Sequence, residues 1–165
     1  MLPVPPMPPT SQRPQAPGRG FTLIEMLVTV LVTIILLGVA APSFLSAIAR
    51  LRLEGMVNEL SVDLQYARSA AIRRQAGVTL ATSEDGGFYT INSGELILKV
   101  VILPLGTVLT GNVNVAFDPL RGTASVAQLD ASSVLLTPRL RASTNAMGRV
   151  QLCSPNGDFA GYGRC

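Results

Sequence analysis

An uninterrupted apolar run at residues 21–41 constrains this chain more than any other feature of its sequence. The run holds 21 residues with a single charged side chain, Glu25, and no proline. As an α-helix rising about 1.5 Å per residue it would extend roughly 31 Å, which matches the hydrocarbon core of a bilayer. The run therefore predicts a membrane-spanning helix, in which the Glu25 carboxylate costs about 2.5 kcal/mol or more near the bilayer centre and needs a partner.

The residues that open this run form a specific motif, Gly-Phe-Thr-Leu-Ile-Glu at positions 20–25. Followed by an unbroken apolar segment, the motif resembles the processing site of type IV pilins and of the pseudopilins of type II secretion systems. The resemblance implies that a prepilin peptidase cleaves after Gly20 and methylates the new N-terminus, Phe21. It also implies that Glu25 sits beside the N-terminal amine of a neighbouring subunit and sets filament register, which would offset the cost of burying its charge.

Two other interpretations of the run are possible. A secretory signal peptide carries its cleavage site after a short apolar region, whereas here the cleavage motif precedes a run that is too long for that role. A plain single-pass anchor would leave Glu25 snorkelling to the interface, because it lies near one end of the span. The six-residue motif favours the pilin-like interpretation over both.

The rest of the sequence predicts one small anchored domain. About 124 residues follow the leader and the span, which is enough for one compact domain with its own core. Seven prolines in the leader prevent a helix there and favour an extended chain. The predicted segments are a cleaved leader at 1–20, a transmembrane helix at 21–41, an amphipathic continuation of the helix at 42–77 and a β-rich domain at 78–165.

Charge gives little further guidance. The chain has 13 basic and 10 acidic residues, so it lacks a global nucleic-acid signature, although local clusters of basic residues remain open. Arg13 and Arg19 precede the span, and Arg50 and Arg52 lie within reach of its other end, so the positive-inside rule does not decide the orientation. A periplasmic C-terminal domain anchored in the bacterial inner membrane is implied by the resemblance alone.

The segment after Pro42 has a helical pattern of apolar residues. Pro42 removes one helical hydrogen bond and should kink the helix or mark where it leaves the membrane. Arg73 and Arg74 favour the last turn because of the helix dipole, and Gly77 is predicted to cap it. The apolar stripe recurs at steps of three and four and predicts the face that covers a sheet; it comprises Leu45, Ala49, Leu53, Met56, Leu60, Leu64, Ala67 and Ala71.

From residue 78 onward, short β-type runs alternate with turn residues. Residues 83–87 contain two glycines between two such runs and predict a hairpin. Short strands on one long helix make an α+β domain with an antiparallel sheet. The seven predicted strands are 78–82, 88–92, 96–103, 113–117, 123–128, 134–137 and 149–153.

Two similar segments, 115–125 and 134–143, each read as a strand, a proline turn, an arginine and small residues. Together with the long helix and the strand after Gly77, this pattern resembles the GspH/FimT branch of the pilin-like family. That branch includes the minor pseudopilin H of type II secretion and the FimT-type minor pilins. One departure is Leu140, which stands where a glycine would be expected in the second turn.

The two cysteines, Cys153 and Cys165, both lie in the part of the chain expected to face an oxidising compartment. We expect a disulfide between them, which would contribute roughly 2–3 kcal/mol by restricting the unfolded chain. The enclosed loop is rich in turn residues and would fray without this link. Two cysteines without any histidine fall short of a usual metal-ligand set, so no metal site is predicted.

No catalytic constellation is evident. The chain has no histidine, and its paired glycines belong to the predicted hairpin and not to a phosphate-binding loop. Three carboxylates on the helix, Glu54, Glu59 and Asp63, are expected to be solvated surface charges. We therefore predict a subunit that is a substrate of enzymes and not an enzyme, and we predict no cofactor.

These features favour a minor pseudopilin of a type II secretion system, which assembles with other pilins or pseudopilins through its helix. The expected partners are those subunits, the prepilin peptidase and inner-membrane lipid. The alternative is a FimT-type minor pilin of a type IV pilus that binds DNA during natural transformation. Arginines make up 12 of the 13 basic residues and suit phosphate contacts; the candidates for DNA binding are Arg139, Arg141, Arg149 and Arg164, with only Asp158 expected to oppose them.

Overall fold

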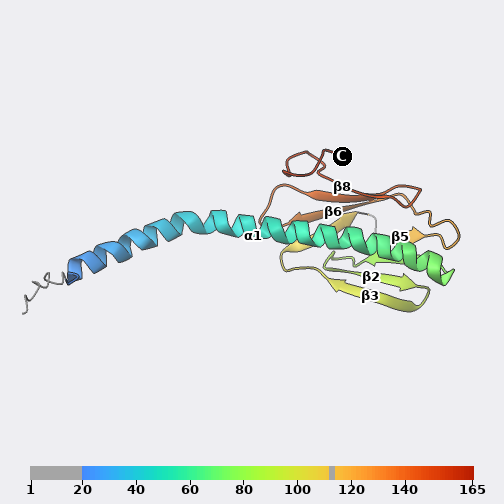
Figure 1. The fold of residues 1–165 in the computed structure, drawn as a ribbon, viewed down its shortest axis with the longest axis horizontal. Coiled ribbons are helices and arrows are strands. Elements are labelled where there is room, and N and C mark those ends of the chain that lie inside the picture. The colour runs from blue at the N-terminus through green and yellow to red at the C-terminus, as the bar shows by residue number, and fades with distance from the viewer. Residues whose placement is uncertain (1–19, 112–113) are drawn as a thin grey trace, which may run out of the picture. The chain divides into compact units, whose positions relative to one another are not determined.

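The structure, a computed structural model, describes residues 20–111 and 114–165. The chain forms two compact units, Met1–Val39 and Ala40–Cys165. One long helix, α1 (Leu23–Arg74), begins in the first unit and continues through Pro42 into the second (Figure 1). The predicted leader, apart from Gly20, lies outside the described residues, as does Val113.

The described part of the first unit, residues 20–39, is almost entirely apolar helix, and no other described residue packs on it. Every residue from 20 to 47 is exposed, including large side chains such as Ile24, Leu31 and Leu37. This part of α1 is long and apolar enough to cross a membrane. Apolar surface on this scale is unusual for a soluble protein, so the segment requires lipid or other helices around it.

In the second unit α1 packs on two antiparallel four-stranded sheets (Figure 1). The first sheet has the order β3-β2-β1-β5, with strands Leu96–Ile102, Phe88–Ser93, Val78–Thr82 and Asn114–Phe117. The second has the order β4-β6-β7-β8, with strands Thr107–Gly111, Ala127–Ser133, Leu140–Thr144 and Val150–Cys153. The predicted α+β class and the antiparallel sheet domain are confirmed, with the strands divided between two sheets.

Helix and sheets share one core. The helix contributes large apolar residues in its middle and alanines toward its end, where small side chains allow close approach to the strands. Leu45 was predicted to belong to the buried stripe, but it is 55% exposed, because burial begins only at Ala49. The buried helix residues are Ala49, Leu53, Met56, Val57, Leu60, Asp63, Leu64, Ala67, Ala70 and Ala71.

The β1–β2 hairpin joins the two sheets. The predicted turn at 83–87 is confirmed, with the Ser83 N–H donating to the Phe88 carbonyl at 2.9 Å. The Leu109 N–H of β4 donates to the Gly86 carbonyl at 3.0 Å. A Cβ on Gly86 would lie 2.2 Å from the Leu109 carbonyl oxygen, and φ at this residue is +67°, so only glycine fits here.

The strand predictions were partly wrong. Four of the predicted ranges are confirmed to within one residue: 78–82, 88–92, 96–103 and 149–153. Within the predicted range 113–117, residues 114–117 form a strand. The ranges 123–128 and 134–137 are wrong, because the strand in that region is β6, at 127–133. Strands β4 and β7 were missed, and Leu140 is not a turn residue, since it begins β7 and is fully buried.

The C-terminus of α1 differs from the prediction that Gly77 caps it. The helix ends at Arg74, and Gln75 follows with φ of +52°. The Ala76 N–H donates to the Ala71 carbonyl and the Gln75 N–H to the Ile72 carbonyl, each at 3.3 Å. This is the Schellman arrangement, with glutamine in the left-handed position that glycine usually occupies.

Replacing Gln75 with glycine should therefore stabilise the domain. Removing the Cβ relieves the left-handed strain, and we expect a gain of about 0.5–1 kcal/mol in the free energy of unfolding. Chemical denaturation followed by circular dichroism measures the change. Gln75→Ala is the matched control and should give no gain, because alanine keeps the Cβ; equal stabilisation by both variants would contradict this explanation.

Candidate functional site

The N-terminal motif includes a helix cap. The Thr22 hydroxyl accepts a hydrogen bond from the Glu25 N–H at 3.2 Å, and the Thr22 carbonyl accepts one from the Met26 N–H at 3.2 Å. Thr22 is thus the N-cap residue of α1, and Thr-x-x-Glu is the sequence of a capping box. Sequence reasoning considered only the processing motif here and missed this second signal.

The Glu25 carboxylate is exposed in the first turn of α1, where the helix dipole favours a negative charge. No hydrogen-bond or ion-pair partner for it occurs among residues 20–111 and 114–165. Gly20 and Phe21 precede the helix, and Phe21 is 77% exposed. The motif therefore presents an accessible backbone next to an unpaired carboxylate.

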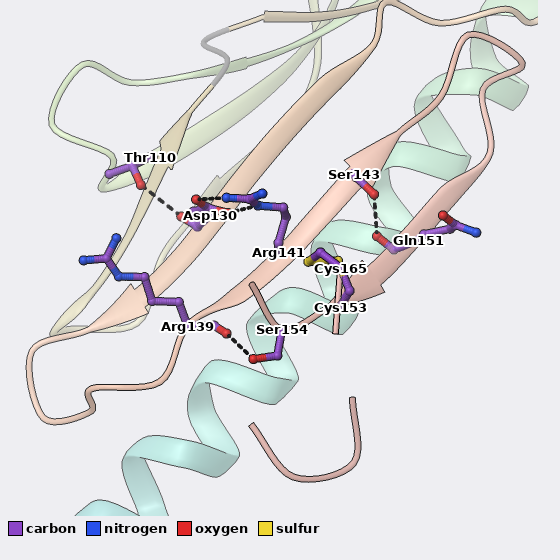
Figure 2. Close-up of polar contacts among 9 residues, drawn as sticks. All are labelled: Thr110, Asp130, Arg139, Arg141, Ser143, Gln151, Cys153, Ser154 and Cys165. Carbon is purple, nitrogen blue, oxygen red and sulfur yellow. Dashed lines mark hydrogen bonds and ion pairs between the residues drawn. A yellow bond between two sulfur atoms is a disulfide. The ribbon is translucent and has the colours of Figure 1, made fainter. Parts of the chain in front are cut away.

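The four arginines proposed for DNA binding are in different environments. Arg141 lies on β7 and forms a bidentate pair with Asp130 on β6, at 2.5 Å from Nε to Oδ1 and 2.8 Å from the terminal nitrogen to Oδ2 (Figure 2). This hydrogen bonding raises the pKa of the Arg141 guanidinium. The expectation that only Asp158 opposes these arginines was therefore wrong, because the β6–β7 register places Asp130 directly opposite Arg141.

The other three arginines are exposed. Arg139 precedes β7, and its carbonyl accepts a hydrogen bond from the Ser154 hydroxyl at 3.4 Å (Figure 2). Arg149 precedes β8, and Arg164 lies next to the last cysteine. Of the four, only Arg141 and Arg164 line the same hollow, a depression of about 500 Å³ whose lining also includes Gln128, Ser143 and Gln151.

A disulfide joins Cys153 at the end of β8 to Cys165, with an S–S distance of 2.10 Å (Figure 2). The loop that it closes is also held against α1. Phe159 is 2% exposed and lies under the Arg50 guanidinium, 4.6 Å from the ring centroid. Arg50 also donates to the Ala160 carbonyl at 2.7 Å, so the helix orients this C-terminal loop.

One helix carboxylate is not on the surface. Asp63 was expected to be solvated, but it is 4% exposed and lies between α1 and the first sheet. It accepts a hydrogen bond from the Tyr89 hydroxyl at 2.7 Å and from the Lys99 ammonium at 2.8 Å to each oxygen. Burial and the Asp63 carboxylate raise the pKa of Tyr89, so its hydroxyl stays protonated and donates.

Lys99 is the outer member of this cluster. It also approaches the exposed Glu59 at 3.3 Å, and its contact with Asp63 is the main cause of a raised pKa. The residues come from α1, β2 and β3, and every partner is satisfied. The cluster fixes the helix on the sheet, and a buried charge in such a network is tolerated only because it is paired.

Comparisons with known proteins agree with this architecture. Residues 56–164 match the sequence pattern of the family described as type II transport protein GspH. The Pseudomonas aeruginosa type IV minor pilin FimU is similar at a TM-score of 0.52 and 20% identity, over 62% of this chain and 89% of that one. A second crystal form of FimU has a TM-score of 0.51 and 20% identity, over 60% of this chain and 90% of that one.

The minor pseudopilin EpsH from the type 2 secretion system of Vibrio cholerae is also similar. Its TM-score is 0.53 at 12% identity, over 63% of this chain and 98% of EpsH. At such low identities these structures show a shared fold and no more. Among curated proteins, none matches this chain.

Proposed function

The chain belongs to the GspH family, whose members are pilin-like structural subunits, and from this membership we propose that it is a minor pseudopilin of a type II secretion system. The observation that carries the proposal is the exposed apolar first half of α1, which follows Gly20, Phe21 and the N-cap Thr22 and bears Glu25, a carboxylate with no partner within the described part of the chain. Such a helix needs neighbouring helices or lipid around it.

In this proposal the subunit waits in the inner membrane with its sheets in the periplasm. Prepilin peptidase cleaves after Gly20 and methylates Phe21, which leaves α1 at the new N-terminus. Glu25 then pairs with the N-terminal amine of an adjacent subunit as the helices pack together. The closed disulfide fits an oxidising compartment such as the periplasm.

The first test is in-membrane crosslinking followed by mass spectrometry of the captured partners and of the N-terminus of this chain. We expect a chain that begins at methylated Phe21 and is linked to secretion pseudopilins. The same N-terminus linked to pilus subunits would transfer the assignment to a type IV pilus. An intact Met1 without pilin-like partners would contradict the proposal as a whole.

DNA binding as a FimT-type minor pilin is the second candidate function. It is favoured by three exposed arginines, Arg139, Arg149 and Arg164, which form no ion pair within the described part of the chain. Arg141 is a weaker candidate than its sequence position suggested, because Asp130 already occupies its guanidinium.

DNA binding should then depend steeply on salt. Replacing Arg164 with glutamine should weaken binding uniformly across sequences and reduce the slope of log affinity against log salt by about one unit. Arg141→Gln is the matched control on the same hollow and should change the slope less, because Asp130 neutralises the wild-type charge. Fluorescence anisotropy with duplex DNA measures both variants; no binding at low salt would remove this candidate.

A further inference from the structure

Two turns of the domain carry large apolar side chains where polar residues are usual. Leu105, between β3 and β4, is 96% exposed, and Val134 and Leu135, which follow β6, are 81% and 60% exposed. Turn tips are normally occupied by Gly, Asn, Asp, Ser or Pro. We call these three residues the apolar rim.

The apolar rim is held in place by hydrogen bonds. The Thr107 N–H donates to the Pro104 carbonyl at 3.0 Å, and Gly106 between them has φ of +81°, which fixes Leu105 at the tip. The Leu136 N–H closes the other turn on the Ser133 carbonyl at 3.1 Å. A third bond, from the Val134 N–H to the Gly106 carbonyl at 3.0 Å, joins the two turns. The exposure of the rim is thus a property of the ordered fold.

The rim lies beside the part of α1 that follows the apolar run. A hollow of about 110 Å³ is lined by all three rim residues and by Leu45, Ile48 and Arg52 of the helix. Leu45 is only four residues after Ala41, so in any backbone conformation it lies within about 14 Å of the end of the run. The headgroup region adds about 5–8 Å on each side of the hydrocarbon core. The rim is therefore restricted to the neighbourhood of a bilayer surface.

Charge around the rim suits the same surface. Arg52 is exposed, and among the residues that the structure describes its guanidinium has no hydrogen-bond or ion-pair partner. No acidic residue lines the hollow. Apolar side chains next to an unpaired cation are the combination that binds the headgroup and acyl boundary of anionic membranes.

We propose that the apolar rim and Arg52 dock the domain onto the surface of the membrane that holds its helix, with Leu105 and Val134 inserted among the lipid headgroups and Arg52 at the phosphates. This inference rests on the proposed membrane anchoring. It adds a second attachment, from the sheet domain, that would orient the waiting subunit. Release of this contact would then accompany incorporation into a filament.

The chain has no tryptophan, so a single introduced indole reports its own environment without background. The full chain carrying Leu105→Trp or Val134→Trp would be reconstituted in phosphatidylethanolamine–phosphatidylglycerol vesicles with and without brominated acyl chains. We expect emission shifted to the blue and strong quenching by the brominated lipid. Leu120→Trp is the matched control, since Leu120 is 85% exposed on a turn beside Gly122, which lies against Ile72 near the end of α1.

Three further measurements decide the outcome. Val30→Trp places the indole in the apolar run, and if brominated lipid does not quench it, the proposed membrane anchoring is wrong. Quenching at position 30 without quenching at position 105 overturns only the rim inference. A third result would also overturn the rim inference: emission from position 105 that shifts further to the blue as protein density rises but is not quenched by brominated lipid. That result would mean that the rim contacts other subunits. Adding Arg52→Gln to Leu105→Trp should reduce quenching in phosphatidylglycerol-containing vesicles but not in pure phosphatidylcholine.

Discussion

Replacing Glu25 with alanine is expected to leave cleavage after Gly20 intact and to reduce recovery of the subunit with its assembly partners by about tenfold or more. The substitution would leave the N-terminal amine of the neighbouring subunit in an apolar surrounding without its partner, and a tenfold loss corresponds to only about 1.4 kcal/mol. Co-purification with crosslinked partners measures incorporation, and the mass of the mature N-terminus measures cleavage in the same sample.

A matched variant separates the charge of the Glu25 side chain from its size and polarity. The cap bond comes from the Glu25 backbone N–H and not from its carboxylate, so Glu25→Gln keeps that bond and nearly the same side-chain size while removing the charge. If the charge is what matters, glutamine should impair assembly as much as alanine does. Normal assembly of Glu25→Gln would attribute the alanine defect to loss of the polar side chain and not of its charge, and normal assembly of both variants would show that Glu25 has no role in register.

The helix could be predicted from the sequence because its signals are long and periodic. The apolar run and the stripe from Ala49 to Ala71 extend over many turns, so one misplaced residue does not change the conclusion. The C-terminus of the helix was predicted less well, because Gly77 is the better capping residue by propensity. In the structure Gln75 takes the left-handed position instead, and the first strand begins at Val78.

The strands of the second sheet show where sequence patterns are too weak. Strand β6 reads Ala-Gln-Leu-Asp-Ala-Ser-Ser, and its inward residues are Ala127, Leu129, Ala131 and Ser133. Small inward side chains suit a narrow space between helix and sheet, but they carry little of the hydrophobic contrast on which strand prediction depends. The apolar residues just after β6, Val134 and Leu135, have a higher strand propensity than most residues of β6. In the structure, however, they lie on the exposed turn.

Charge pairs made by tertiary contacts were beyond sequence reasoning. Asp130 and Arg141 are 11 residues apart, and Asp63 and Lys99 are 36 apart, so only the register of the strands and the placement of the helix bring them together. An acidic residue in a helix is usually solvated, and nothing in the local pattern distinguishes Asp63 from Glu59. The motif at 20–25, by contrast, is local and could be identified directly.

Replacing Asp63 with alanine is expected to destabilise the domain by about 3 kcal/mol, because it removes the acceptor shared by two donors and leaves the buried Tyr89 hydroxyl unpaired. The Lys99 side chain is 37% exposed and can turn to solvent. The loss of unfolding free energy should therefore lie at the lower end of the range of about 3–5 kcal/mol for breaking a buried ion pair. Urea denaturation of the full chain in detergent micelles, followed by the β-sheet circular dichroism signal, measures the change.

Glu59→Ala is the matched control, since this carboxylate contacts the same ammonium at 3.3 Å but is 51% exposed, and its loss should cost less than about 1 kcal/mol. Tyr89→Phe removes only the hydroxyl and should cost about 1 kcal/mol. The double variant Asp63→Ala/Tyr89→Phe should lose less stability than the sum of the two single variants, because phenylalanine leaves no donor unsatisfied. If the Asp63 and Glu59 variants lose the same unfolding free energy, burial of the Asp63 carboxylate does not determine its contribution to stability. If the losses of the two single variants add strictly in the double variant, Tyr89 and Asp63 act independently.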